Sequence, residues 1–489
     1  MVKDYRLETV VLVCGAVTMV LEMTGSRILG PYVGTSTYTW TSLIGVILGA
    51  MSLGYWLGGR WADSNANKLG LSKIILAAGG AIGIIFFVKD LVLQVLTQTG
   101  IDTTLAAIGA AIGLFFGPSL LLGMVSPIAA KIRLNSVENS GQTVGNLYAL
   151  STLGSILGTF LAGYFLIPSY GSGMVLIILT VTLTLLSLLL SGFDKWKGRT
   201  GLIVLVTVLA TLWPGSRLTK KLLADVDTEY SRVWIFDTII NNRSTRCLTT
   251  DPTGIQSAKY LDSDELVFDY TKYYRLGDVF NQNINEALMI GGAGYSYPRD
   301  FLARHLKATM TVVEIDPGMT RLAKEYFGLK ENPRLRITHE DGRVFLNRNK
   351  NKYDVIYIDA FNSTTVPFQL TTVEAIRKMW EALEADGVVL TNLISAREGE
   401  KAEFLRAEYK TYKEVFPSVW LFRVKDEVAT KKQNIMLVAF KETRTEVNRG
   451  VDGELASYLE TKMEIKGDME GQRILSDDWA PVEKMVEKG

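Results

Sequence analysis

Hydrophobic residues are concentrated in the first part of the chain. Long apolar segments with few charges lie near residues 8–30, 38–61, 71–98, 104–130, 142–168 and 171–192. Each segment reaches or exceeds the ~20 residues that a membrane-spanning helix needs. Glycines recur inside them, as in LIGVILGAMSLGYWLGG, and small residues let helices pack closely in lipid. The pattern predicts a polytopic α-helical membrane bundle over residues 1–220, with the lipid bilayer as its partner.

A seventh apolar segment, GLIVLVTVLATLWP at 201–214, has 14 residues, which suits an interfacial helix as well as a span. We therefore expect six or seven spans. Lysine and arginine gather before the first span and after the second, fourth and sixth, which places the N-terminus inside. With six spans, a multi-pass protein of the cell membrane would carry its polar half in the cytoplasm. Glu22 and Arg27 fall in the first span, where charges are functional candidates.

The periodicity changes near residue 227. The short β-branched and aromatic runs VWIFDTII, TRCLTTD and LVFDYTKYY predict a small antiparallel β domain over 221–284. From 286 onward, the strand patterns ALMIGG, TMTVVEID, LRITHED, DVIYIDAF and GVVLTNLI alternate with helical stretches such as PGMTRLAKEYFG and TVEAIRKMWEALEADG. This alternation predicts a parallel, doubly wound α/β domain of Rossmann-like type over 285–489. SVWLFRVKD and NIMLVAFK add two closing strands.

Composition removes several classes of function. The net charge is +1 and no basic block occurs, so we expect no nucleic-acid partner. The chain has 2 cysteines, too few for a disulfide framework. Its 2 histidines stand outside any metal-binding motif, so we expect no metal.

Candidate binding residues follow the ends of successive strands. Gly291, Gly292 and Gly294 end the first strand of the α/β domain, and Glu314, Asp341 and Asp359 end the next three. Ligands of such sheets bind beyond the carboxyl ends of the strands, where a glycine turn allows close approach and a carboxylate can accept ribose hydroxyls. Because GxxxxGK[ST] is absent, these residues indicate a nucleoside site without a phosphate-binding lysine. The competing interpretation is that Glu314 and Asp341 cap helices or turns.

These residues also carry a resemblance. The order and spacing of GGAGYSYPR, VVEIDPGMTRLA, HEDGRVFL and YDVIYIDAF resemble the spermidine synthase family of aminopropyltransferases. That family has a methyltransferase-type sheet preceded by a β-hairpin domain. The apolar half, with GPYVGTSTYTWTSLIGVILGAMSLGYWLGGRWAD, and the near-terminal SDDWAPVE resemble membrane-fused members of the group. The resemblance implies decarboxylated S-adenosylmethionine as cofactor and an amine, usually a diamine, as acceptor.

The resemblance also implies roles for individual residues. Glu314 matches the acid that binds the cofactor ribose, and Asp341 with the adjacent Gly342 matches the adenine side. Gln256 and Tyr270 match cofactor contacts of the β domain. Asp359 matches the catalytic base. This suits a displacement at a sulfonium by an amine, because the amine must lose a proton before it attacks and a carboxylate can accept that proton.

Two positions depart from the family pattern. The family aspartate that grips the aminopropyl ammonium is replaced by Gly294, followed by Tyr295, and the second acid of the DxxD motif is Asn362. We expect Tyr295 and Asn362 to contact the substrate instead. Asp477 and Asp478 would restore negative charge if the C-terminal segment folds over the site, and the alternative is a solvated turn.

Three functions remain open on the sequence. The first is a membrane-bound aminopropyltransferase. The second is a methyltransferase that uses ordinary S-adenosylmethionine on the same fold. The third is a transporter of polyamines or other small molecules whose polar domain senses a nucleoside. A homodimer is a further expectation.

Overall fold

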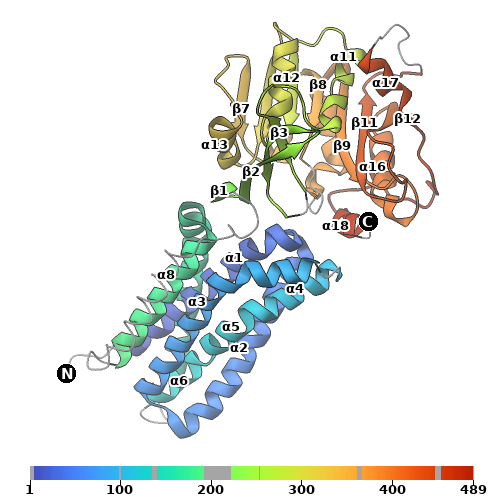
Figure 1. Cartoon of the computed structure of the whole chain (residues 1–489). Helices are drawn as coiled ribbons and strands as arrows, with labels where there is room; N and C mark the ends of the chain where they lie inside the picture. Colours follow the sequence, from blue (N-terminus) through green and yellow to red (C-terminus); the bar gives the residue numbers. More distant parts are fainter. Residues whose placement is uncertain are drawn as a thin grey trace. The chain divides into compact units, whose positions relative to one another are not determined.

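The computed structural model describes residues 5–98, 101–134, 140–191, 222–252, 254–360, 366–445 and 453–487. The chain divides into two compact units, Met1–Lys220 and Lys221–Gly489. Figure 1 draws the helices of the first unit and the sheets of the second.

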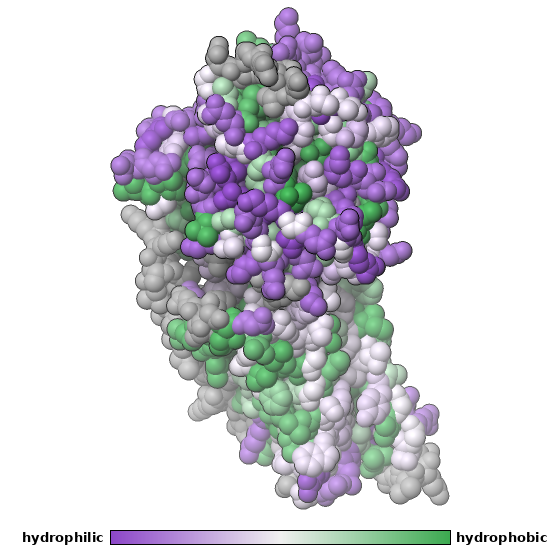
Figure 2. All heavy atoms as spheres, turned by 90° about the vertical axis from the view of Figure 1, so that its right-hand side faces the viewer, coloured by the Kyte–Doolittle hydropathy of each residue, from purple (hydrophilic) through white to green (hydrophobic). Residues whose placement is uncertain are grey.

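The described residues of the first unit are helical apart from the ends and short connections. Two π-helical turns, η1 (Ile112–Phe116) and η2 (Ala162–Leu166), interrupt the longer rods. The helices are α1 (Arg6–Val33), α2 (Thr37–Asn65), α3 (Lys68–Gln98), α4 (Thr103–Ala111), α5 (Gly117–Gly123), α6 (Val125–Arg133), α7 (Ser140–Leu161) and α8 (Ile167–Ser191). Figure 2 shows that the visible surface of this unit is largely apolar, whereas polar residues gather on the second unit.

Five helical stretches of the first unit are long and apolar enough to cross a membrane by length and composition. The sequence predicted six apolar segments here, and the difference lies in the last stretch, Ser140–Ser191, which has 52 residues. At ~1.5 Å per residue, this stretch is much longer than the ~30 Å core of a bilayer. Gly171 interrupts it with non-helical backbone angles, φ 72° and ψ 166°. The seventh apolar segment, 201–214, lies outside the described residues.

Close glycine contacts join α1 to α7. A Cβ atom added at Gly154 would lie 1.9 Å from the carbonyl oxygen of Leu12, and one at Gly158 would lie 2.4 Å from that of Ala16. From the other side, a Cβ at Gly15 would lie 2.3 Å from the carbonyl oxygen of Ser151. These backbones touch because the glycines have no side chain, as the glycine-rich segments of the sequence predict.

The second unit begins with a four-stranded antiparallel sheet in the order β1-β2-β3-β4. Its strands are β1 (Leu222–Asp227), β2 (Arg232–Ile240), β3 (Arg243–Thr249) and β4 (Ser257–Tyr260). Asn241 and Asn242 connect β2 to β3 with positive φ angles of 52° and 60°. This backbone matches the two-residue turn that the right-handed twist of a hairpin favours.

The strand predicted from LVFDYTKYY is wrong. Residues 269–280 form two short helices, α10 (Asp269–Tyr273) and α11 (Leu276–Phe280). The hydroxyl of Thr271 donates to the carbonyl of Phe268 at the start of the first helix. Tyr273 and Tyr274 are buried together against the larger domain. Tertiary packing of these aromatic residues therefore overrides their β propensity.

The larger domain has an eight-stranded sheet in the order β12-β10-β11-β9-β8-β5-β6-β7. Strands β5 to β9 are parallel, and β11 runs antiparallel to both β9 and β10. This is the predicted Rossmann-like, methyltransferase-type fold. The strands are β5 (Glu286–Ile290), β6 (Thr309–Glu314), β7 (Leu335–His339), β8 (Tyr353–Ile358), β9 (Leu383–Ser395), β10 (Ser418–Arg423), β11 (Gln433–Phe440) and β12 (Lys462–Met463).

Helices cover both faces of this sheet. Successive side chains of a strand point to opposite faces, so Leu288 and Ile290 of β5 join one core cluster while Ala287 and Met289 join the other. The first face packs against α14 (Gly342–Arg348), α15 (Val373–Ala382), α16 (Glu403–Lys413) and α18 (Val482–Glu487), and the second against α10, α11, α12 (Ser296–Arg304) and α17 (Glu454–Glu460). The remaining helices are α13 (Pro317–Tyr326), η4 (Phe368–Leu370) and η5 (Glu400–Ala402).

Candidate functional site

The carboxyl ends of β5, β6 and β8 meet at one edge of the sheet. The amide of Gly291, just after β5, donates to the carbonyl of Val313 in β6 across 2.9 Å. On the other side, the amide of Asp359 donates to the carbonyl of Ile290 across 2.9 Å. The glycine turn therefore lies between the second and fourth strand tips.

The glycine turn is held in a shape that a side chain would disrupt. Gly291 has φ +96°, and a Cβ there would lie 2.5 Å from the carbonyl oxygen of Asp359. A Cβ at Gly292 would lie 2.7 Å from the ring of Tyr295. Because neither glycine carries a side chain, a ligand can approach the backbone of the turn closely.

Glu314 holds this turn from the end of β6. Its Oε2 accepts from the amides of Gly292 at 2.8 Å and Ala293 at 3.0 Å, and its Oε1 accepts from Asp316 at 3.0 Å. Burial raises the pKa of Glu314, although the three amide donors act in the opposite direction. An ionised carboxylate has about four acceptor positions, so one remains for a ribose hydroxyl. The site fits the nucleoside cofactor that the fold implies.

Asp341 is the N-cap of α14, as the competing interpretation expected. Its Oδ1 accepts from the amides of Arg343 at 2.8 Å and Val344 at 3.1 Å, while Gln369 approaches Oδ2 at 3.3 Å. Gly342 follows, and a Cβ there would lie 2.6 Å from Ile290. The adenine contacts expected of both residues stay predictions, because capping explains the geometry of Asp341 and close packing that of Gly342.

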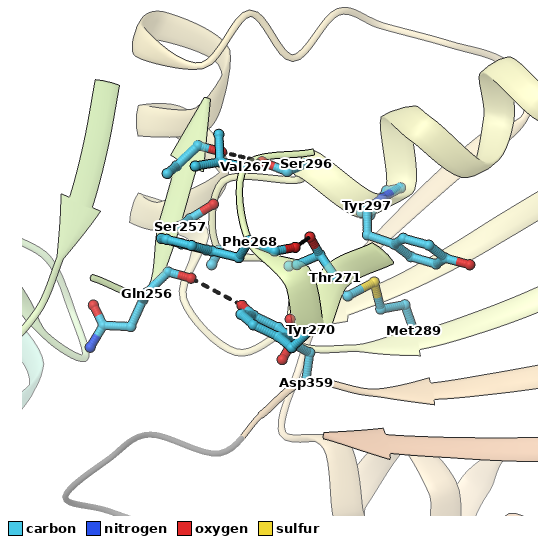
Figure 3. A pocket seen from close by; sticks show the side chains of 14 residues that line it. Gln256, Ser257, Val267, Phe268, Tyr270, Thr271, Met289, Ser296, Tyr297 and Asp359 are labelled. Atoms are coloured by element: carbon cyan, nitrogen blue, oxygen red, sulfur yellow. Dashed lines mark hydrogen bonds between the residues drawn. The ribbon is translucent and has the colours of Figure 1, made fainter. Parts of the chain in front are cut away.

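A pocket opens beside the glycine turn, on the face of the sheet that packs against α10 and α12. Figure 3 shows its lining residues. The four predicted site residues that it brings together are Gly292, Gln256, Tyr270 and Asp359. Glu314, Asp341 and Gly342 do not line this pocket. Glu314 is nevertheless bonded to its rim through Gly292 and Ala293.

Asp359 lines the pocket, and an uncharged asparagine side chain donates a hydrogen bond to its carboxylate. Its Oδ1 accepts from Nδ2 of Asn392 at 3.4 Å, and Asn434 in turn donates to Oδ1 of Asn392 at 3.0 Å. Removal from water raises the pKa of Asp359 to about 6, while Asn392 and Tyr274 moderate the rise. A carboxylate with this pKa can accept a proton near neutral pH.

Tyr270 faces Asp359 in the pocket, and its hydroxyl donates to the backbone carbonyl of Gln256 across 3.4 Å (Figure 3). Burial and the nearby Asp359 raise the pKa of Tyr270, so its phenol stays protonated. The side chain of Gln256 points away, and its amide binds Thr250 and Asp251 instead. Gln256 therefore lines the pocket with its side chain turned away, and its predicted contact with the cofactor stays a prediction.

The departure at the glycine turn, Gly294, packs against the β domain. A Cβ at Gly294 would lie 2.3 Å from Oγ of Ser257 in β4, so an aspartate at this position would require the Ser257 side chain to shift. Tyr295 is fully buried, and its hydroxyl pairs with Thr320 at 2.7 Å. The ring of Tyr295 packs against Gly292, and its expected contact with the substrate stays a prediction.

The C-terminal acids have different positions from those expected. Asp477 forms a two-pronged ion pair with Arg343 at 3.0 and 2.7 Å and accepts from Thr372 at 2.7 Å. Burial acts against its ionisation, but Thr372 and Arg343 outweigh this and lower the pKa of Asp477. It ties the C-terminal segment to α14, and it does not line the pocket. Asp478 is exposed. Asn362 lies outside the described residues, and its role stays a prediction.

Several pocket residues were not found from the sequence. Ser257, Phe268, Thr271 and Met289 line the pocket, and Asn392 supports its carboxylate. Asn392 left one signal, a polar residue inside the apolar strand pattern GVVLTNLI. The described residues contain no group of three or more His, Cys, Asp or Glu side chains that could hold a metal ion.

Comparison with known proteins shows which proteins this chain is similar to. Residues 273–449 match the spermine/spermidine synthase domain. The chain is 26% identical over 300 residues to a polyamine aminopropyltransferase of Vibrio vulnificus, covering 57% of this chain and 97% of the relative. It is 33% identical over 145 residues to an N-terminal histidine N-methyltransferase of Emericella nidulans, covering 28% of this chain and 25% of the relative. A crystal structure of a probable spermidine synthase from Corynebacterium glutamicum superposes with a TM-score of 0.41 at 21% identity, over 48% of this chain and 84% of that one. Residues 273–449 are thus similar to a spermine/spermidine synthase domain, and the chain is a transferase similar to the polyamine aminopropyltransferases.

Proposed function

We propose that the protein transfers an aminopropyl group from decarboxylated S-adenosylmethionine to an amine, with Asp359 as general base. The observation that carries this proposal is the Asp359 carboxylate in a pocket next to the glycine turn, supported by Asn392 and with its pKa raised to about 6. The similarity to polyamine aminopropyltransferases supports the identity of the transferred group.

We assign cofactor binding and proton transfer to two different groups of residues. In this proposal, Glu314 and the glycine turn hold the ribose side of the cofactor, and Asp341 contacts the adenine. The cofactor, when bound, supplies a sulfonium whose carbon can be attacked. Asp359 binds the ammonium of the acceptor and takes its proton, which frees the lone pair for attack. Tyr270 and the adjacent apolar wall limit the water around this carboxylate, and holding the amine in line provides much of the remaining acceleration.

Mass spectrometry of products tests this function. Purified full-length protein would be incubated with decarboxylated S-adenosylmethionine and a panel of amines, with Asp359→Asn run in parallel. We expect an aminopropylated amine from the unaltered protein and a loss of about 100-fold or more in the variant. Equal rates in both would reject Asp359 as the base.

A methyltransferase reaction is the second candidate. The glycine at position 294 favours it, because glycine provides no carboxylate to hold an aminopropyl ammonium. Calorimetry with the two forms of the cofactor separates the candidates. Tighter binding of the decarboxylated form supports aminopropyl transfer, and tighter binding of ordinary S-adenosylmethionine supports methyl transfer.

We also infer that the first unit holds the protein in the cell membrane. Support comes from five helical stretches of suitable length and hydropathy and from exposed apolar side chains such as Leu48, Ile84 and Tyr164. Sedimentation of the full chain with membranes after a carbonate wash tests this inference. Release into the supernatant would contradict it.

A further inference from the structure

The pocket and the adenosine-binding residues occupy different parts of the sheet edge. Asp359 follows β8, whereas Glu314 ends β6 and Asp341 follows β7, and β5 separates β8 from the other two. A general base must lie within hydrogen-bond reach of the amine that it deprotonates. The pocket around Asp359 is therefore the acceptor side of the proposed reaction.

This pocket contains a single carboxylate. Among its 14 lining residues, Asp359 is the one acid, and no lysine, arginine or histidine is present. The neighbouring acids on the outer side are already matched with cations: Asp264 with Lys259 and Arg299, and Asp300 with Arg275 and Arg304. Within the described part of the chain, the pocket therefore offers one carboxylate to neutralise an ammonium group.

Part of the pocket wall is apolar or aromatic, and neutral hydroxyl side chains (Ser257, Thr271 and Ser296) line another part. Val267, Phe268, Met289 and Pro298 supply hydrocarbon surface, and Tyr270 stacks on Phe268 with ring centroids 6.0 Å apart and an interplanar angle of 16°. Such surfaces favour a carbon skeleton, and aromatic faces also attract a single cation. A second ammonium placed against this wall would lose water without gaining a counter-charge.

We propose that the acceptor is an amine with one positive charge on an apolar aliphatic or aromatic skeleton, not a diamine. This inference rests on the proposed function of Asp359 as the base at this pocket. The reaction balances as a displacement: the amine nitrogen bonds to the transferred carbon, the carbon–sulfur bond breaks, the sulfur keeps the electron pair as a neutral thioether, and Asp359 takes the proton.

Matched acceptors test the proposal on the full-length protein in detergent. n-Pentylamine and 1,4-diaminobutane have nearly the same length and differ by a terminal methyl against a terminal amine, and 2-phenylethylamine adds an aromatic skeleton. Each amine would be offered with each form of the cofactor, and kcat/KM would be measured by product mass. We expect the monoamines to exceed the diamine by about tenfold or more. A diamine that reacts equally well or faster overturns the proposal.

Variants of the wall give a second readout. Phe268→Ala should raise KM for 2-phenylethylamine by about tenfold and leave KM for the diamine nearly unchanged. Phe268→Glu should reduce the ratio of kcat/KM for the monoamines to kcat/KM for the diamine. Ile239→Ala, at a 72% exposed position of the same β domain, is the matched control. A Phe268→Ala variant with unchanged KM for every amine contradicts the assignment of Phe268 to the pocket wall.

If the diamine reacts and the monoamines do not, the proposed function stands and the proposed acceptor class is wrong. If no amine reacts with either cofactor, both fail.

Discussion

Asn392 donates from its side-chain amide to the carboxylate of Asp359 across 3.4 Å. Asn392 lies in β9, and Asp359 directly follows the neighbouring parallel strand β8. Asn392 is itself oriented by Asn434, which donates to its carbonyl oxygen. An amide supports a carboxylate without supplying a positive charge, so Asp359 keeps a raised pKa and retains its basicity. A lysine in the same place would stabilise the ionised form and weaken the base.

The first prediction concerns Asp359→Asn. This variant should lose about 100-fold or more in kcat while it binds the cofactor with nearly unchanged affinity, because Glu314 and the glycine turn remain. Steady-state kinetics and calorimetry measure the two effects. Asp386→Asn, the same chemical change at an exposed position, should affect neither. Loss of cofactor binding in the Asp359 variant would indicate a structural role instead.

The second prediction concerns pH. Asp359 works as a base when ionised, so kcat/KM should rise with pH through an apparent pKa of about 6. Asn392→Ala removes a bond that lowers this pKa, and the rising limb should therefore move to higher pH. The free energy of unfolding changes with pH in the opposite direction to activity. Asp359 binds its proton more tightly in the folded state than in the unfolded state, where an aspartate has a pKa of about 3.9. Its contribution to stability is therefore lost as pH rises from about 4 to 6. A pH profile that does not move in Asn392→Ala would argue against this contact.

The fold was largely readable from the sequence because strands and helices of the α/β domain have different periods. The helix at Asp269–Tyr273 was missed because Tyr273 and Tyr274 have strand propensity but are buried through tertiary contacts. The strand tips could be located from the pattern, since parallel strands end at the same edge. The orientation of the side chains could not be predicted from the pattern. Gln256 and Tyr295 lie at the expected positions in the chain, but hydrogen bonds with Thr250 and Thr320 turn their side chains away from the pocket. Their neighbours in space, rather than in sequence, decide this.

The third prediction concerns Glu314→Gln. The amide nitrogen of glutamine cannot accept from a backbone amide, so at least one of the three bonds to Gly292, Ala293 and Asp316 is lost. We expect cofactor affinity to fall about 10- to 100-fold and unfolding free energy to fall by about 1–3 kcal/mol. Calorimetry and thermal unfolding measure these changes, and Glu325→Gln at an exposed position of α13 is the control. Normal cofactor affinity in the Glu314 variant would remove it from the binding site.

The fourth prediction concerns the contact between Gly294 and Ser257. Gly294→Asp should lower the unfolding free energy by about 1–3 kcal/mol, because its Cβ would lie 2.3 Å from Oγ of Ser257. Adding Ser257→Gly should recover much of this loss, while Ser257→Gly alone should change stability little. Thermal unfolding of the three variants measures the coupling. Additive effects without rescue would show that the contact does not exclude an acid at this position.

The last prediction concerns the packing of α1 against α7. Gly154→Ala adds one methyl group where a Cβ would lie 1.9 Å from the carbonyl oxygen of Leu12. A backbone carbonyl cannot rotate aside, so the two helices must separate, and the unfolding free energy should fall by about 1–3 kcal/mol. Gly45→Ala is the matched control, because it makes the same change in α2 with no atom within 4 Å of the new Cβ. It should be neutral or slightly stabilising, since alanine favours a helix over glycine. Unfolding of the detergent-solubilised chain, followed by circular dichroism, compares the pair, and equal stability of both variants would show that α1 and α7 do not depend on glycine contact.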